Sequence, residues 1–188
     1  GFNAFAKSPR FIDGETISDL VKRAGGRIET VVLLVDPDDE AVAAAAVTGA
    51  GWLQFHGKEP PERLDAIRAQ TGKKIIKALA VGGPEDVAAI PAYRAVADRL
   101  ILDAKPPADA TRPGGLGETF DWTLLAGLDR SIPFMLSGGL DADNVKRAVR
   151  EVRPFGLDVA SGVEREKGVK DKGLISAFIA NARAAARE

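Results

Sequence analysis

Short apolar runs separated by helix-like stretches recur along the whole chain. Each run has four to six residues rich in Val, Ile, Leu or Phe, without sustained alternation of polar and apolar positions. Such runs are typical of strands that are buried on both faces of a parallel sheet. The runs that predict strands are Gly1–Phe5, Thr30–Val35, Trp52–Phe55, Lys74–Leu79, Arg99–Leu102, Pro133–Leu136 and Gly156–Val159.

Helix signals fill the stretches that follow these runs. Asp36 followed by Pro37 predicts a helix start with Asp36 as its cap, and a later helix is expected to begin at Asp141 or Asp143. Acidic residues or proline open the helical stretches and basic residues come later in three of them, as the helix dipole favours. The four clearest helical stretches are 36–51, 60–74, 141–152 and 171–188.

Two architectures repeat a strand and a helix in this way, the open doubly wound sheet and the closed (β/α)₈ barrel. The open sheet usually carries a glycine-rich fingerprint after its first strand, but Ala6-Lys7-Ser8-Pro9 stands there. Glycines cluster instead after the last two runs, where barrels often bind phosphate. We therefore predict an α/β fold, a (β/α)₈ TIM barrel that forms a single domain over residues 1–188. Seven units are one short, so the first βα unit is expected to precede Gly1.

Composition and charge narrow the function classes. The 188 residues have a net charge of −1, which gives no electrostatic argument for binding nucleic acid or a membrane surface. No apolar run approaches the roughly 20 residues of a membrane span, and there is no signal-peptide pattern. With no cysteine and one histidine, disulfides, thiolate metal sites and a cysteine nucleophile are excluded within these residues. A cytoplasmic protein is the simplest interpretation.

Glycine turns follow the last two predicted strands. They are Ser137-Gly138-Gly139-Leu140 and Ser161-Gly162. Glycine lets the backbone approach a ligand closely, and successive N–H groups in such turns form a concavity that binds anions. Either turn alone could be no more than a tight strand–helix connection. Both together, on the last two units, predict a phosphate site.

A third glycine-rich loop follows the run at 99–102. It contains Arg112, Gly114 and Gly115 and is long for a connection of this kind. Because long loops are commonly functional, we expect it to cover a ligand. The alternative is an exposed loop without a role.

Several polar residues stand within or just after the strands. Asp103 directly follows a buried run, where barrels place catalytic groups. A carboxyl group that is partly removed from water favours its protonated form and can donate a proton. The alternatives for Asp103 are a helix cap or an ion pair with Lys105. Lys77 and Asp158 lie in or at the end of strands and are expected to turn toward the polar mouth of the barrel.

Gln54 and His56 bracket Phe55, so both side chains should lie on the same side of their strand. A lone histidine is more often structural than catalytic, and that alternative stays open here. Arg10, in the turn after the first run, could bind a carboxylate through two parallel hydrogen bonds. Exposure without function is the common alternative for an arginine.

These motifs, in this order and spacing, resemble one known family. The segments are GFNAFAKSPR, QFHG, LILDAK, GGLGETFDW, LSGGL and LDVASGVE with GVKD after it. Together they resemble phosphoribosylanthranilate isomerase, a (β/α)₈ enzyme of tryptophan biosynthesis, over the whole chain.

The resemblance implies an Amadori rearrangement of a phosphosugar substrate, with no cofactor and no metal. It implies that Asp103 is the general acid and that Arg10 contacts the anthranilate carboxylate. Substrate-binding and phosphate-binding residues would follow the motifs. They are Gln54, His56, Gly114, Gly115 and Asp158 for the substrate, and Gly138, Gly139, Ser161 and Gly162 for the phosphate. Relatives include monomers and homodimers, so either state is expected.

The general base of the family is a cysteine in a KxCG motif on the first strand, and no cysteine occurs in these 188 residues. The segment GFNAF matches the second strand of the family. Three explanations are open: a copy shortened at its N-terminus, a missing piece supplied by another chain, or a non-catalytic relative. His56 as a substitute base is a weak option, because the family keeps this histidine beside the cysteine.

Two other interpretations compete with the isomerase. The first is another phosphosugar barrel. Indole-glycerol-phosphate synthase would show lysine and glutamate pairs on its early strands, and the isomerase of histidine synthesis would show two similar halves. Neither pattern is present. A module that binds a phosphorylated ligand without turnover is the other interpretation.

Overall fold

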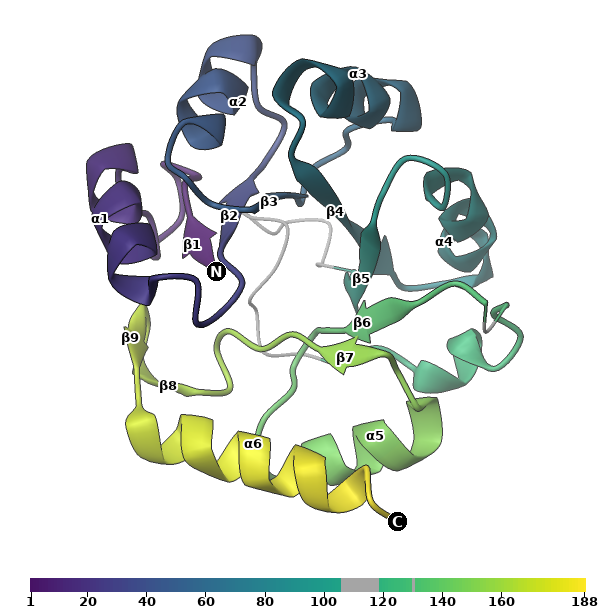
Figure 1. Ribbon diagram of the computed structural model, residues 1–188. Helices are drawn as coiled ribbons and strands as arrows, with labels where there is room; N and C mark the ends of the chain where they lie inside the picture. The colour runs from purple at the N-terminus through teal and green to yellow at the C-terminus, as the bar shows by residue number, and fades with distance from the viewer. Residues whose placement is uncertain (106–118, 130) are drawn as a thin grey trace. The chain divides into compact units, whose positions relative to one another are not determined.

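The computed structural model describes residues 1–105, 119–129 and 131–188 of the chain (Figure 1). Seven strands follow one another in a single sheet in chain order, and a separate hairpin pairs two more. The strands are β1 (Phe2–Asn3), β2 (Val31–Leu34), β3 (Trp52–Phe55), β4 (Lys74–Val81), β5 (Arg99–Ala104), β6 (Phe134–Leu136), β7 (Gly156–Leu157), β8 (Glu164–Glu166) and β9 (Val169–Lys170).

The helices alternate with the strands of the sheet. They are α1 (Gly14–Ala24), α2 (Asp39–Ala46), α3 (Pro61–Thr71), α4 (Pro84–Ala89), α5 (Val145–Val152) and α6 (Lys172–Ala185), with 3₁₀ turns η1 (Ile90–Tyr93) and η2 (Trp122–Leu125). Each predicted apolar run coincides with one strand of the sheet. The order of the strands and their parallel pairing, from β1 to β4 and from β6 to β7, confirm the predicted strand–helix repeat.

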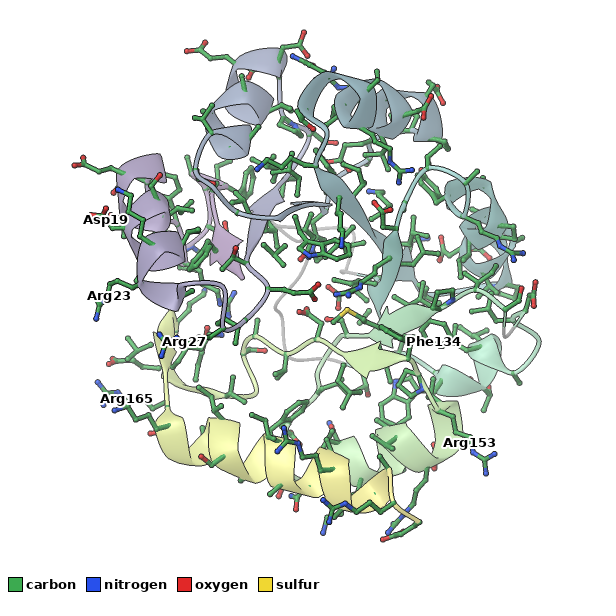
Figure 2. The ribbon with its side chains drawn as sticks, viewed as in Figure 1. Asp19, Arg23, Arg27, Phe134, Arg153 and Arg165 are labelled. Carbon is green, nitrogen blue, oxygen red and sulfur yellow. The ribbon has the colours of Figure 1, made fainter. Side chains whose placement is uncertain are left out.

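The chain divides into two compact units. The first comprises residues 1–78 and 92–100. In it, α1, α2 and α3 lie on the same side of β1, β2 and β3 (Figure 1), and their apolar faces form a core with the strands. Charged side chains such as Asp19 and Arg23 project outward from α1 (Figure 2). Its buried members include Ile17, Val32, Leu34, Val42, Leu53, Phe55, Leu64, Ile67 and Ile75.

The second unit comprises residues 79–91 and 101–188. Its strands β6 and β7 pair in parallel, with Met135 opposite Gly156 and Leu136 opposite Leu157. The helices α5 and α6 lie side by side (Figure 1). The hairpin of β8 and β9 connects the turn after β7 to the start of α6, whose cap Asp171 accepts a hydrogen bond from the N–H of Leu174 at 2.9 Å.

The prediction that Asp36 caps a helix is wrong. The helix α2 begins at Asp39, and its cap is Asp38, whose Oδ1 accepts the N–H of Ala41 at 2.8 Å. Asp36 instead has a positive φ of 43°, and its Oδ1 accepts the N–H of Lys58 at 2.6 Å. Aspartates stand on both sides of Pro37, and the capping rule alone does not choose between them.

The predicted start of a helix at Asp141 or Asp143 is also wrong. The helix α5 begins at Val145, with Asn144 before it. Asp141 closes the preceding turn instead, because its Oδ1 accepts the N–H groups of Asp143 and Asn144 at 2.9 Å each. The same kind of hydrogen bond that would cap a helix holds a turn here.

Candidate active site

Asp103 is a buried carboxylate near the end of β5, with 4% of its surface exposed. Its Oδ1 accepts the N–H of Ala104 at 2.9 Å. The predicted alternative of an ion pair with Lys105 is not what the structure has, because the Lys105 ammonium pairs with Asp86 at 2.9 Å. Lys105 lies beyond the last residue of β5, so strand alternation no longer keeps its side chain on the face of Asp103.

Gly138 lies directly against Asp103 in the same unit. A Cβ added at Gly138 would stand 2.5 Å from the amide nitrogen of Ala104 and 3.0 Å from Oδ1 of Asp103. Gly138 and Gly139 both have positive φ, of 88° and 58°. Close approach and left-handed backbone both require glycine at position 138. The turn after β6 therefore packs against the Asp103 carboxylate.

Hydrogen bonds hold the turn after β6 from both sides. The N–H of Ser137 donates to the carbonyl of Leu102 at 2.8 Å, which joins the turn to β5. The side-chain amide of Asn144 donates to the carbonyl of Gly139 at 2.8 Å. Asn144 also accepts the N–H of Asp141 at 3.0 Å. These hydrogen bonds hold the glycine turn in place.

The turn after β7 touches the turn after β6. An isolated parallel bridge joins Asp141 to Gly162, and a Cβ at Gly162 would collide with the carbonyl oxygen of Leu140. The hydroxyl of Ser137 donates to Oδ2 of Asp158 at 3.2 Å. The two glycine turns predicted from the sequence therefore lie together, beside Asp103 and Asp158.

The hairpin of β8 and β9 braces the turn after β7. The Lys170 ammonium donates to the carbonyl of Ala160 at 2.7 Å and to the Glu164 carboxylate at 3.0 Å. The N–H of Glu164 donates to the carbonyl of Ser161 at 3.0 Å. This hairpin was not predicted, although glycine at position 168, which has a positive φ of 88°, is typical of turns.

Gln54 and His56 come together in the first unit, as strand alternation predicts. The amide nitrogen of Gln54 lies 3.4 Å from Nδ1 of His56, and Gln54 is 7% exposed. Arg10 lies in the turn after β1, where its N–H donates to the hydroxyl of Ser8 at 3.1 Å. Arg112, Gly114 and Gly115 lie outside the described residues.

Lys77 is a buried cation whose ammonium binds the loop that follows β3. Its side chain is 1% exposed, and its ammonium lies 2.7 Å from the carboxylate of Glu59. Register explains the position: Lys77 lies opposite Phe55 on the neighbouring strand, so its side chain extends toward the loop that follows β3. Glu59 is a residue that the sequence analysis missed.

In the described part of the chain, no three histidine, cysteine, aspartate or glutamate side chains gather as they would around a metal ion. None of the described helices has the length and apolar character that crossing a bilayer requires.

Comparison with known proteins decides the family. The model of the N-(5′-phosphoribosyl)anthranilate isomerase family matches residues 1–181. The chain belongs to this family. A curated isomerase of this name from Azorhizobium caulinodans is 55% identical over 186 residues, which are 98% of this chain and 82% of that protein.

Solved structures of the phosphoribosylanthranilate isomerase family have the same fold. The crystal structure of the Thermotoga maritima enzyme superposes with a TM-score of 0.87 at 34% identity, covering 98% of this chain and 87% of that one. Another isomerase of the family was crystallised with reduced 1-(o-carboxyphenylamino)-1-deoxyribulose 5-phosphate. Its TM-score is 0.82 at 30% identity, and the match covers 98% of this chain and 86% of that one. The predicted (β/α)₈ fold class is therefore confirmed.

Proposed function

We propose that this chain isomerises N-(5-phosphoribosyl)anthranilate to 1-(2-carboxyphenylamino)-1-deoxyribulose 5-phosphate, an Amadori rearrangement in tryptophan biosynthesis. Membership of the isomerase family supports the reaction. The observation that carries the proposal within this molecule is the contact between Asp103 and Gly138, which brings a buried carboxyl to a glycine turn suited to phosphate. The rearrangement moves hydrogen within one molecule, so it consumes no external oxidant or reductant.

Asp103 is assigned the role of general acid. Its proton goes to the furanose ring oxygen, the bond between that oxygen and C1′ breaks, and the lone pair of the anthranilate nitrogen forms a C=N bond. A base then takes the proton from C2′, which gives an enolamine. The enolamine becomes the ketone when its hydroxyl loses a proton and C1′ gains one. Asp103 is 4% exposed and lies against the glycine turn after β6, so its carboxyl is placed beside the proposed phosphate site.

The phosphate is assigned to the backbone of Gly138, Gly139, Ser161 and Gly162. Gly138 and Gly139 both have positive φ, and glycine turns of this kind are suited to presenting backbone N–H groups to an anion. The bridge between the two turns supports one shared phosphate site rather than two separate ones.

The other substrate contacts rest on the family motifs. Arg10 is assigned to the anthranilate carboxylate, and Gln54, His56, Asp158, Gly114 and Gly115 to the rest of the substrate. The proximity of Gln54 to His56 supports a shared role for these two side chains.

The base that the family uses is a cysteine, and these 188 residues contain none. The proposal therefore assigns the acid of the reaction and assigns no residue to the base.

A turnover assay tests the proposal. Purified protein is mixed with N-(5-phosphoribosyl)anthranilate, the loss of substrate fluorescence is followed, and the borohydride-reduced product is identified by mass. We expect saturable conversion with a kcat of about 1 s⁻¹ or more, in the ordinary range for enzymes. Asp19→Asn, on the outer surface of α1, should turn over at the wild-type rate. Tight binding of the reduced product without any conversion would favour the non-catalytic phosphate-binding interpretation instead.

A further inference from the structure

Lys77 and Glu59 form a buried ion pair that the proposed chemistry does not use. Their side chains are 1% and 3% exposed, and the Nζ–Oε2 distance is 2.7 Å. Both belong to the first unit, Lys77 on β4 and Glu59 in the loop between β3 and α3. Removing two charges from water is costly, and an apolar pair of the same volume often gives equal or greater stability. Stability alone therefore does not account for this pair.

The two charged groups bind backbone atoms beyond the ends of neighbouring strands. Glu59 accepts the N–H of Asp36, past the end of β2, at 2.8 Å, and the N–H of Gly57, past the end of β3, at 3.0 Å. Lys77 donates to the carbonyl of Gly57 at 2.6 Å. Gly57 thus has both its N–H and its carbonyl bound by the pair.

The residues around the ion pair hold Asp36 in a backbone conformation that is uncommon for a residue with a side chain. Asp36 keeps a positive φ of 43° while its Oδ1 accepts the N–H of Lys58 at 2.6 Å. A Cβ at Gly57 would collide with the Asp36 carboxylate, so only glycine fits there. A positive φ in a residue with a side chain costs energy and persists only where the surroundings hold it.

Tyr93 contacts both members of the ion pair. Its hydroxyl donates to the carbonyl of Glu59 at 3.3 Å, and the Lys77 ammonium lies 5.9 Å from the centre of its ring. Burial raises the pKa of the Tyr93 phenol, and the negative charges of Glu59 and Glu62 add to this effect. The hydroxyl therefore remains a hydrogen-bond donor at neutral pH.

We propose that Lys77 and Glu59 are positioning residues that hold Gln54 and His56 in place by clamping Gly57, the residue that follows His56. This inference rests on the proposed function for the role of Gln54 and His56 in binding substrate. The ion pair binds Gly57, Gly57 adjoins His56, and Nδ1 of His56 lies 3.4 Å from the side-chain amide nitrogen of Gln54. Displacements of about 1 Å in such groups cost about 100-fold in rate.

The test uses a double variant that removes both charges with little change in volume, Lys77→Met with Glu59→Gln. Its matched control is Glu29→Gln with Arg99→Met, which removes a half-exposed ion pair of the same length, 2.7 Å, from the first unit. Glu59→Gln alone is a milder variant for the case in which the double variant does not fold.

Because these 188 residues contain one histidine, a sample with ¹³C-labelled histidine should report on His56 in a single set of ring signals. We expect the Lys77/Glu59 variant, or Glu59→Gln if the double variant does not fold, to shift and broaden this signal. We also expect kcat/KM to fall about 10- to 100-fold. The Glu29/Arg99 control should keep both at wild-type values even where its thermal stability falls equally.

An unchanged His56 signal with kcat/KM within twofold of the wild type would overturn the positioning role. A wild-type protein that does not turn over the substrate would instead contradict the proposed function. The His56 signal would still decide whether the pair holds this segment.

Discussion

At the scale of single residues, the site depends on how closely the backbone at Gly138 approaches Asp103. The glycine has a positive φ of 88°, and a methyl group in its place would stand 3.0 Å from the carboxylate oxygen. The position therefore combines a conformation that favours glycine with a contact that excludes any side chain. The contact involves Asp103, the residue to which we assign the acid role.

Gly138→Ala should lower the free energy of unfolding by about 2 kcal/mol or more, from backbone strain and the clash with Ala104. It should also lower kcat/KM about 100-fold, since the clash displaces Asp103. Gly127→Ala is the matched control, because Gly127 lies in an exposed turn with nothing within 4 Å of an added Cβ. Urea unfolding and steady-state kinetics measure both variants. Equal stability and activity of the two would contradict the close contact at position 138.

At the scale of elements, one carboxylate joins the turn before α4 to the end of β5. Asp86 accepts the N–H of Gly82 at 2.9 Å and of Gly83 at 3.1 Å, and it pairs with the half-exposed Lys105. Burial alone would raise the pKa of Asp86, but the hydrogen bonds from Lys105 and from the two N–H groups outweigh it. They hold the pKa below its ordinary value of 3.8. The bond to Asp86 raises the pKa of Lys105 above 10.5.

Asp86→Asn should lower the free energy of unfolding at pH 7 by about 1 kcal/mol, since charge-assisted hydrogen bonds are lost from a partly exposed pair. A lowered folded pKa means that the contribution of Asp86 is present above the ordinary value and is lost as the pH falls through the folded value. The difference in urea midpoint between wild type and variant should therefore persist from pH 7 to about pH 4 and close below it. A difference that stays constant down to pH 2 would contradict the lowered pKa.

The strands could be predicted from the sequence more surely than the turns. Each apolar run forms a strand. An unbroken run of Val, Ile, Leu and Phe is typical of a strand that is buried on both faces of a parallel sheet. The caps were less certain, since Asp36 and Asp38 carry the same chemical signal and only the folded chain distinguishes them. The pairing of Lys77 with Glu59 joins residues of different elements, and it depends on strand register, which the sequence pattern did not supply.

The candidate site was predictable where its residues follow strands directly. Asp103, Gly138 and Gly162 each come at or soon after the end of an apolar run, and the structure brings them into one region of the second unit. The hydrogen bond from Ser137 to Asp158 was not predicted, because it depends on how two turns face one another.

At the scale of the whole molecule, charge offers little help in binding an anionic substrate. The net charge of the chain is −1, while a phosphoribosyl anthranilate carries both a phosphate and a carboxylate. Without a strong overall field, binding depends on local groups, and we assign oriented N–H groups to the phosphate and Arg10 to the carboxylate.

The central claim is that a proton from Asp103 acts on a sugar whose phosphate is held by the turns after β6 and β7. Asp103→Asn tests it most directly, because the amide keeps the shape of the side chain but cannot serve as the acid. We predict that kcat falls at least 1,000-fold, within the range of general acid catalysis. The dissociation constant of the reduced product analogue, measured by calorimetry, should change less than about threefold. A variant that retains kcat within tenfold of the wild type would contradict the account.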